Sequence, residues 1–548
     1  MLSARLKKCC DAGNLDEAVA MLKNAPLDAQ NTPVWNTLIW ECMKVKRFQL
    51  GYQLFIDVMS LFHILWYHFS KRMYQMKRRG FSPTTRTFQT MFNGLSKIEH
   101  WATHPKQLAN ARSLYDGFQR HIATVKKHDP TSSEISSNPL ASYLKILGAA
   151  GQYQGVFDVY YAMDTEGPFA ANEYIFTAMF QALSTSAFAS TDQGGAKTAG
   201  DARLLWMQML KASNKTPGFS IDSYSVVAAI TALSSGRKTD QDLAFQIVKE
   251  YFGLATGEDN SSAGRLPLGA ESLAAILRLC NRAQRYSACL DFFKQVKRRP
   301  EDTGGVSVLD RAHIEEVLRA LFLSEEPGLA YRSLDTLEWM LRQEITGHNG
   351  PKIRPAISTY NLVLAACWRG VDWNSATRTF ELMTGYHCHD FMDGSLADPP
   401  RLDKRAPGRN LAPTAESLSS MVRTAFASKN RANMRQCLRI VDFLGLRDLW
   451  HLGGVESKKS LKHHAFYLTK LATALVEMVD YVLKGNRKQA SSEKEFIQWN
   501  ALAEEARRLA DKNHTSLIPM REVGTVPVRF QPERTGKKAL GRSVNPVD

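Results

Sequence analysis

Apolar residues recur at spacings of three and four along most of the chain, in paired short segments. Within residues 358–383, Tyr360 and Val363 fall on one face of a first segment, and Phe380 and Met383 fall on one face of a second. This periodicity is typical of two amphipathic helices joined by a short turn. The same frame recurs in residues 33–57 and 271–296. The pattern therefore predicts a helical hairpin that repeats along the chain.

Weaker copies of this hairpin extend the pattern. They begin near Arg86, Leu140, Tyr174, Asp222, His313 and Glu416. A chain of 548 residues is too long for one compact core, whereas a repeat array packs each unit only on its neighbours. We predict an all-α fold, a right-handed α-solenoid of stacked helix-turn-helix repeats over residues 1–445.

Outside the hairpins, composition predicts loops, a cap and a tail. Segments rich in Gly, Pro, Ser, Thr and Asp predict loops at residues 189–200, 253–269, 301–306 and 387–413. Two further helices, at residues 461–483 and 493–512, are expected to cap the array within a C-terminal region of residues 446–512. The basic stretch 513–548 lacks apolar periodicity and is expected to be disordered.

Several short motifs resemble the pentatricopeptide repeat family. They are VWNTLI from Val34, STYNLVL from Ser358, MKRRGFSPT from Met76 to Thr84 and CDAGNLDEAVAML from Cys10 to Leu22. Each motif matches a different part of that family's pattern. Tetratricopeptide repeats are the main structural rival, but their Trp, Gly, Tyr and Pro signature is missing. The resemblance implies stacked helical hairpins that bind single-stranded RNA.

A block of 18 residues interrupts the family pattern between its first two clear copies. Asn36 and Gln89 occupy equivalent places but lie 53 residues apart, and removing residues 58–75 restores a spacing of 35. The block begins with Val and ends with Gln, whose codons can supply the GT and AG that bound an intron. We hypothesise a retained intron in the gene model of an intron-rich eukaryote such as a fungus. A genuine insertion that lengthens the helix is the alternative.

The N-terminus MLSARLKKCC is basic but runs directly into the repeat pattern, so no separable targeting peptide is visible. Because a solenoid end is expected to carry a polar capping unit, we expect residues, including any presequence, to be missing upstream. The resemblance, together with the intron-like block, points to a fungal mitochondrial member of the family, located in the matrix.

Net charge, cysteine spacing and the absence of catalytic motifs bear on the class of function. The excess of Lys and Arg gives a formal net charge of +16, which suits a polyanion such as RNA. The eight cysteines form no CxxC pair, which indicates a reducing compartment, and no apolar stretch is long enough for a membrane span. Phosphate-binding, nucleophile-elbow and HExxH motifs are absent from the sequence. We expect no catalysis, no cofactor and no metal site, including at the loop residues His387 to Asp390.

The family resemblance also implies which residues face RNA bases. Carried over by alignment, the base-facing positions are Asn36, Gln89, Ala141, Thr177, Ser225, Ala274, Glu315, Asn361 and Ser419, and the second reading position is clear at Thr84. The polar members Asn36, Thr84, Gln89, Thr177, Ser225 and Asn361 are the predicted RNA-binding residues. Basic clusters at residues 77–79, 297–299 and 458–459 are candidates for phosphate contacts.

The sequence therefore predicts a non-catalytic, single-stranded RNA-binding protein of organellar RNA stability, processing or translation. Its partners would be RNA and, in addition, the mitochondrial ribosome or other RNA-processing proteins. One alternative is a protein-binding helical scaffold, such as a respiratory-complex assembly factor or a component associated with the mitochondrial ribosome. A nuclease is the second alternative, and it would need clustered acidic residues to hold a metal ion.

Overall fold

The computed structural model describes ten stretches of the chain: residues 2–26, 29–57, 83–185, 192–216, 218–257, 264–324, 326–347, 349–446, 458–484 and 493–516. Contacts divide the chain into unit 1, Met1–Met383, and unit 2, Thr384–Asp548. The hypothesis about residues 58–75 and the prediction for the tail beyond residue 516 lie outside the described residues. Residues 513–516, predicted as part of the tail, belong to helix α25.

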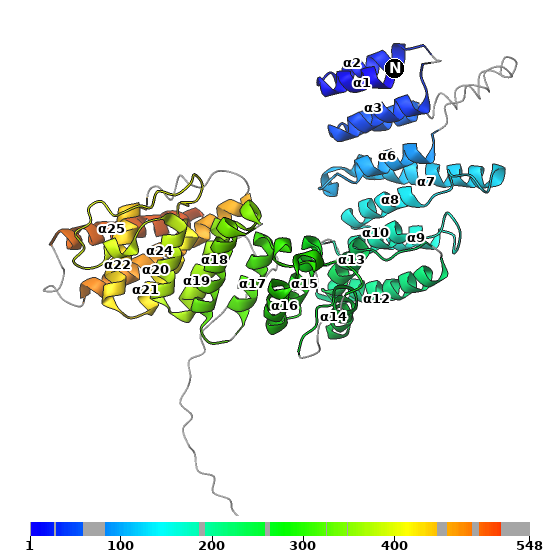
Figure 1. Ribbon diagram of the computed structural model, residues 1–548. Helices are drawn as coiled ribbons and strands as arrows, with labels where there is room; N and C mark the ends of the chain where they lie inside the picture. The colour runs from blue at the N-terminus through cyan, green and yellow to red at the C-terminus, as the bar shows by residue number, and fades with distance from the viewer. Residues whose placement is uncertain are drawn as a thin grey trace, which may run out of the picture. The chain divides into compact units, whose positions relative to one another are not determined.

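Unit 1 is a series of helical hairpins, in which the first helix of each pair is called A and the second B (Figure 1). The A helices are α1 (Leu2–Asp11), α3 (Thr32–Lys44), α6 (Thr85–Leu95), α8 (Asn138–Ala149), α10 (Glu173–Leu183), α13 (Ser223–Leu233), α15 (Ala270–Arg282), α17 (Arg311–Leu323) and α19 (Ile357–Gly370). The B helices are α2 (Leu15–Asn24), a helix described over residues 48–57, α7 (Pro105–His128), α9 (Tyr153–Tyr161), α12 (Asp192–Lys215), α14 (Lys238–Phe252), α16 (Tyr286–Arg298), α18 (Leu329–Thr346) and α20 (Trp373–Thr384). The predicted all-α fold of repeated hairpins is confirmed.

The A helices pack on one another from repeat to repeat. Each contacts the A helix before and after it, from α1 and α3 through to α17 and α19. Their buried residues follow one register, which α3 shows with Trp35, Leu38, Ile39 and Cys42, each at most 3% exposed. Those positions lie on one face of a helix, so the core of unit 1 is a continuous layer between neighbouring hairpins.

Small residues let consecutive A helices approach closely. A Cβ atom added at Gly148 of α8 would lie 2.6 Å from the Cβ and 2.7 Å from the Cα of Ala182 in α10. A Cβ at Gly94 of α6 would lie 2.4 Å from a side-chain carbon of Met43. The space that a Cβ would need is filled by the Ala182 backbone at Gly148 and by the Met43 side chain at Gly94.

The turn between the A and B helices has the same backbone geometry in five of the repeats. One residue of the turn has φ between 52° and 84° at Gly13, Lys46, Gly151, Gln284 and Val371. The next residue closes the A helix with its amide, which donates to the carbonyl five positions earlier. This hydrogen bond is 2.9 Å long from Arg47 to Cys42 and 3.0 Å from Asp372 to Cys367. It is the Schellman end of a helix, and in these five repeats it fixes where the B helix begins.

One predicted loop is helical instead. Residues 189–200 are rich in Gly, Ser and Thr, but α12 begins at Asp192 and runs through Gly200 to Lys215. Ala199 and Ala202 are fully buried, and a Cβ at Gly195 would contact the Ser235 carbonyl oxygen at 3.2 Å. Packing against the next repeat therefore outweighs the poor helix propensity of this segment. That prediction was wrong from residue 192 onward.

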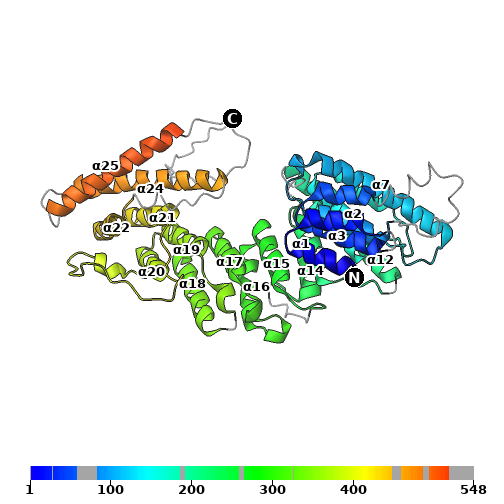
Figure 2. The ribbon, with the colours of Figure 1, turned by 90° about the horizontal axis from the view of Figure 1, so that it is seen from above.

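Unit 2 contains α21 (Ala415–Ala427), α22 (Arg431–Leu444), α24 (Lys458–Lys484) and α25 (Glu493–Ser516). Figures 1 and 2 show α24 and α25 side by side, and α21 packs along α24. The hairpin α21–α22 thus groups with the two helices that were predicted as a cap. The predicted boundary at residue 445 stays a prediction, whereas the contacts place a division at residue 383.

A folded loop precedes these helices within unit 2. Asp390 accepts hydrogen bonds of 2.8 Å from the Arg401 backbone amide and of 2.7 Å from its guanidinium. Gln436 of α22 donates to the Cys388 carbonyl at 2.7 Å. These contacts hold residues 387–401 against α22, so much of the predicted loop at residues 387–413 has a fixed course.

Candidate nucleic-acid interface

One face of the A helices in unit 1 is left open by the packing. Three rows of residues follow it, and they are defined relative to one core position of each A helix. From α3 to α19 this position is occupied by Trp35, Phe88, Leu140, Phe176, Val226, Leu273, Ile314 and Tyr360. The middle row is the residue directly after that core residue. The first row lies three residues before the middle row, and the last row lies four residues after it, which places all three on one side of a helix. We call these three rows, taken over α3 to α19, the A face.

The middle row contains most of the base-facing residues that the sequence predicts. Its members are Asn36, Gln89, Ala141, Thr177, Val227, Ala274, Glu315 and Asn361. Asn36, Gln89 and Thr177 are partly exposed, whereas Asn361 is 7% exposed. The structure therefore brings four of the predicted residues into a single line.

Ser225 does not belong to this line. In α13 the core position is Val226, so Val227 takes the middle-row place and Ser225 lies two residues before it. Its side chain is fully buried, and its amide donates to the capping carboxylate of Asp222 at 2.8 Å. The alignment missed this because Ser, Val and Ala follow one another around that position without a distinguishing side chain.

Thr84 and Ser419 also lie off the middle row of unit 1. Thr84 is the residue that caps α6, where its hydroxyl lies 3.2 Å from the hydroxyl of Thr87. Ser419 belongs to α21 of unit 2 and is fully buried. Thr84 therefore stands at the start of an A helix, next to the first row, while Ser419 has no exposed surface.

Several polar side chains of the A face bind to the neighbouring repeat. Gln89 donates to Asn93 at 2.7 Å, and Asn93 in turn accepts a hydrogen bond from Ser142 of the next A helix. The hydroxyls of Thr177 and Ser225 lie 2.8 Å apart and join α10 to α13. These side chains thus hold the stack together as well as lining its open face.

Glu315 and Asn36 differ most in whether the protein satisfies their hydrogen-bonding atoms. Glu315 accepts hydrogen bonds from Ser358 at 2.7 Å and from Thr359 at 2.9 Å, both from the next repeat. The Oδ1 atom of Asn36, in contrast, is enclosed and has no hydrogen-bond partner in the part of the chain that the structure describes. A buried amide oxygen without a partner carries a free-energy cost that a donor would relieve.

Cations and aromatic rings flank the middle row. Tyr174 and Tyr224, in the first row of consecutive A helices, are 59% and 64% exposed. Trp40 in the last row is 41% exposed, and the ammonium of Lys97 lies 4.8 Å from the centre of its ring. Sequence reasoning missed these rings because it followed the middle row alone. Their exposure is unusual for large aromatic side chains and is a signal of binding.

The charge on the A face is predominantly positive. Its cations are Arg86, Lys145, Arg278 and Arg319, and its carboxylates are Glu271 and Glu315. Arg319 pairs with Glu316 at 2.6 Å, but Arg86, Lys145 and Arg278 have no ion pair within the described stretches. Three exposed cations are therefore available to an anionic partner.

A hollow of about 310 Å³ opens on this face between α13 and α15. Tyr224 and Val227 line one side, and Pro267, Glu271 and Ser272 line the other. It thus joins the first and middle rows of one repeat to the start of the next A helix.

The chain is a helical-repeat protein. Neither a protein-family model nor a curated protein sequence matches it. Among solved structures, it is similar to the crystal structure of the pentatricopeptide repeat protein PPR10 from maize, with a TM-score of 0.43 and 11% sequence identity over 94% of this chain. The chain spans 63% of the length of that protein's structure. The repeat architecture accordingly rests on the hairpins of this chain.

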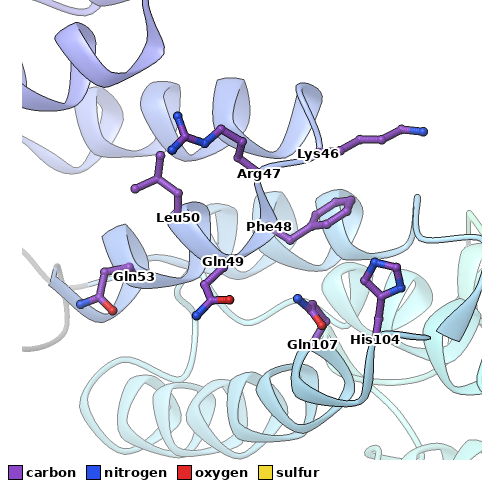
Figure 3. A pocket seen from close by; sticks show the side chains of 8 residues that line it. All are labelled: Lys46, Arg47, Phe48, Gln49, Leu50, Gln53, His104 and Gln107. Carbon is purple, nitrogen blue, oxygen red and sulfur yellow. The ribbon is translucent and has the colours of Figure 1, made fainter. Parts of the chain in front are cut away.

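A second hollow, of about 630 Å³, lies away from the A face of this helical-repeat protein (Figure 3). It is lined by Lys46, Arg47, Phe48, Gln49, Leu50, Gln53, His104 and Gln107. Arg47 is engaged with Asp16 at 2.7 Å. The hollow contains none of the predicted RNA-binding residues.

The described part of the predicted basic clusters is mostly used in packing. Lys297 lies over the rings of Phe293 and Trp339, and burial lowers the pKa of its ammonium. Arg299 donates to the carbonyls of Phe252 and Gly253, at 3.0 Å and 2.7 Å. Residues 77–79 and the side chains of residues 458–459 lie outside the described residues. Arg299 therefore joins α16 to the preceding repeat and Lys297 joins it to the following one, while Arg298 is exposed.

The cysteines form no disulfide, and six of the eight are buried. All eight thiols are free, and burial raises the pKa of Cys42 and Cys367 to about 12. No group of three or more His, Cys, Asp or Glu side chains is placed to hold a metal ion among the residues that the structure describes. No described helix combines the length and apolar character that crossing a membrane requires.

Proposed function

We propose that the A face of this chain binds single-stranded RNA, without catalysis, in organellar RNA stability, processing or translation. The observation that carries the proposal is the combination on one face of a repeating middle row, three cations without ion pairs and exposed aromatic rings. Bases of single-stranded RNA stack on such rings and phosphates bind such cations, while side chains between them contact base edges.

The inter-repeat hydrogen bonds limit how strictly a sequence would be read. Gln89, Thr177 and Glu315 already have partners in the protein, and Val227, Ala141 and Ala274 offer no hydrogen-bonding group. Asn36 is the middle-row residue with an unsatisfied oxygen, and because that oxygen is enclosed, a base amino group would reach it only after the Asn36 side chain turns outward. We infer binding that depends on stacking and charge, with base selection confined to a few repeats such as that of Asn36.

The family resemblance supports a mitochondrial role, and the intron-like block supports a fungal source. A matrix location and a fungal source remain part of this proposal, as do the mitochondrial ribosome and RNA-processing proteins as additional partners. They are tested by locating the tagged, full-length protein in cells and by sequencing the RNA that crosslinks to it.

A salt titration tests RNA binding directly. Affinity for a randomised single-stranded RNA pool should fall steeply with salt, because phosphate contacts release counterions. The triple variant Arg86→Ala, Lys145→Ala and Arg278→Ala should reduce the slope of log affinity against log salt by about 2, at roughly 0.7 per phosphate contact.

A matched control removes three exposed cations from outside the A face. Lys211, Lys238 and Lys494 are exposed and have no ion pair within the described residues, so their replacement by Ala changes the net charge equally and should leave the slope nearly unchanged. Equal slopes for both triple variants and the unaltered chain would contradict binding at the A face.

A protein-binding scaffold is the second candidate, because the outer surface of a B helix is apolar. Leu204 and Met207 lie one turn apart on α12 and are 61% and 51% exposed. Exposed apolar pairs of this kind are typical of protein contacts. A scaffold would show weak binding to the RNA pool with little dependence on the three A-face cations.

A further inference from the structure

Rings and cations alternate on one surface of unit 2. The participants are Phe426, Lys429 and Arg431 from the hairpin α21–α22 and Phe466, Lys470 and Tyr481 from α24. We call this group the aromatic–cation strip. None of its members was singled out by the sequence, because they come from segments separated by a stretch of residues that carries no repeat pattern.

Each cation of the strip lies over a ring. The ammonium of Lys470 is 4.3 Å from the ring centre of Phe466, and that of Lys429 is 4.6 Å from the ring centre of Phe426. The guanidinium of Arg431 is 5.6 Å from the ring centre of Tyr481. These distances are in the range of cation–π attraction, which positions the cations without neutralising them.

The strip keeps its positive charge and its exposed rings. Lys429, Arg431 and Lys470 form no ion pair with a carboxylate in the described stretches of unit 2. Phe466 and Tyr481 are 51% and 39% exposed. Glu477 shares this side of α24, and Glu416 of α21 lies beside Tyr467, so the three cations outnumber the two nearby carboxylates.

The strip is long enough to contact an extended polymer. Phe466, Lys470 and Tyr481 lie on one side of α24, since their spacings of 4 and 11 residues are close to whole helical turns. The distance from residue 466 to residue 481 along the helix is about 22 Å, at about 1.5 Å per residue. A compact anion would contact only one end of it.

We propose that the aromatic–cation strip of unit 2 is a second contact site for single-stranded RNA, which binds phosphates through its three cations and stacks bases on Phe466 and Tyr481. It rests on the proposed function and extends it, because the strip has no amide or hydroxyl row to select a base. The strip therefore binds single strands irrespective of their sequence, in the manner of other stacking surfaces.

The cation test uses the full chain and the randomised single-stranded RNA pool. The variant Lys429→Ala, Arg431→Ala and Lys470→Ala should lower the affinity about tenfold or more at moderate salt and reduce the salt slope by about 2. The Lys211, Lys238 and Lys494 triple variant serves as the charge-matched control. Unfolding by urea, followed by circular dichroism, confirms that each variant is folded.

The ring test separates stacking from charge. The variant Phe466→Leu and Tyr481→Leu keeps apolar bulk and all cations, so it should lower the affinity about tenfold while leaving the salt slope unchanged. Ultraviolet crosslinking of the bound RNA, followed by peptide identification, should place crosslinks at Phe466 or Tyr481 in the unaltered chain.

The outcomes distinguish this proposal from the proposed function. If the A-face triple variant loses affinity and the strip variants do not, the strip proposal is overturned and RNA binding by unit 1 stands. If the unaltered chain does not bind the RNA pool, both fail together. If the strip variants bind RNA as tightly as the unaltered chain, the strip is not an RNA site. That conclusion holds even if the same variants lose binding to a protein partner.

Discussion

Several polar side chains on the A helices form hydrogen bonds between neighbouring repeats, which limits their availability to a ligand. Asn93, Ser142, Thr177 and Ser225 look like free polar positions in the sequence, but they join neighbouring A helices by hydrogen bonds. Such bonds are worth about 1 kcal/mol each when formed and cost more than that when one buried partner is removed. A polar residue at a candidate reading position is therefore not by itself evidence of base contact.

Val371 occupies a turn position that favours glycine. Its φ of 52° is unfavourable for a β-branched side chain, and the side chain is 46% exposed, so little packing is lost on its removal. Val371→Gly should therefore increase the opening free energy of α19 and α20 by about 0.5–1 kcal/mol, measured by amide hydrogen exchange. Val45, 53% exposed in the equivalent turn with φ of −87°, is the control: Val45→Gly should destabilise its hairpin by a similar amount.

The stability of unit 2 should depend on pH through the ionisation of Asp390. Hydrogen bonds from Arg401 lower the pKa of its carboxyl from 3.8 to about 2. A lowered pKa contributes stability that is present above the unfolded pKa and is lost as the pH falls from about 4 toward about 2. Asp390→Asn should be less stable than the unaltered chain at neutral pH, and the difference in urea midpoint should shrink toward zero near pH 2. A difference that stays constant over this range would show that Arg401 does not stabilise the ionised form.

The helices owe their positions to repeated features of the hairpin rather than to any one contact. A left-handed residue in the turn ends five of the A helices, and the core register orients all of them. Close contacts such as Gly148 against Ala182 then set how near two A helices lie. Changes at these points should act on the spacing between repeats.

Substitution of Gly148 by Ala tests the spacing between α8 and α10, and the same substitution at Gly200 is the control. Both are helical glycines, but a Cβ at Gly148 would meet the backbone of α10, whereas a Cβ at Gly200 would meet nothing within 4 Å. Gly148→Ala should destabilise the contact between α8 and α10 by about 1–3 kcal/mol through overpacking. Gly200→Ala should stabilise α12 by about 0.5–1 kcal/mol, the usual preference of a helix for Ala. Urea unfolding of the two variants gives both values, and equal effects would refute the close approach.

Across each unit, the repeated hairpins turn small local features into extended surfaces. In unit 1 they line up the first, middle and last rows of the A face, and in unit 2 they bring α21 and α24 together to form the aromatic–cation strip. Both surfaces combine rings with cations that lack ion pairs. If both bind RNA, removal of the rings from either surface should weaken RNA binding without changing its salt dependence.

Tyr174 and Tyr224 are the rings whose removal tests this prediction on the A face. Replacement of both by Leu should weaken binding to the randomised RNA pool by about 1–3 kcal/mol for each stacked base, with the salt slope retained. Tyr331 is 69% exposed on the B helix α18, so Tyr331→Leu is the matched control and should bind like the unaltered chain. Equal losses for the control would place the effect outside the A face.

The amino-acid sequence alone determined the all-α fold, the hairpin and most of the middle row, because helical periodicity is a local property that neighbouring residues encode. Asn36, Gln89, Thr177 and Asn361 were found from it. Tertiary packing decided that Ser225 is buried, that residues 192–200 are helical and that Tyr174, Tyr224, Phe466 and Tyr481 remain exposed. Burial depends on residues from other repeats, tens of positions away, so no pattern within a single hairpin contains it.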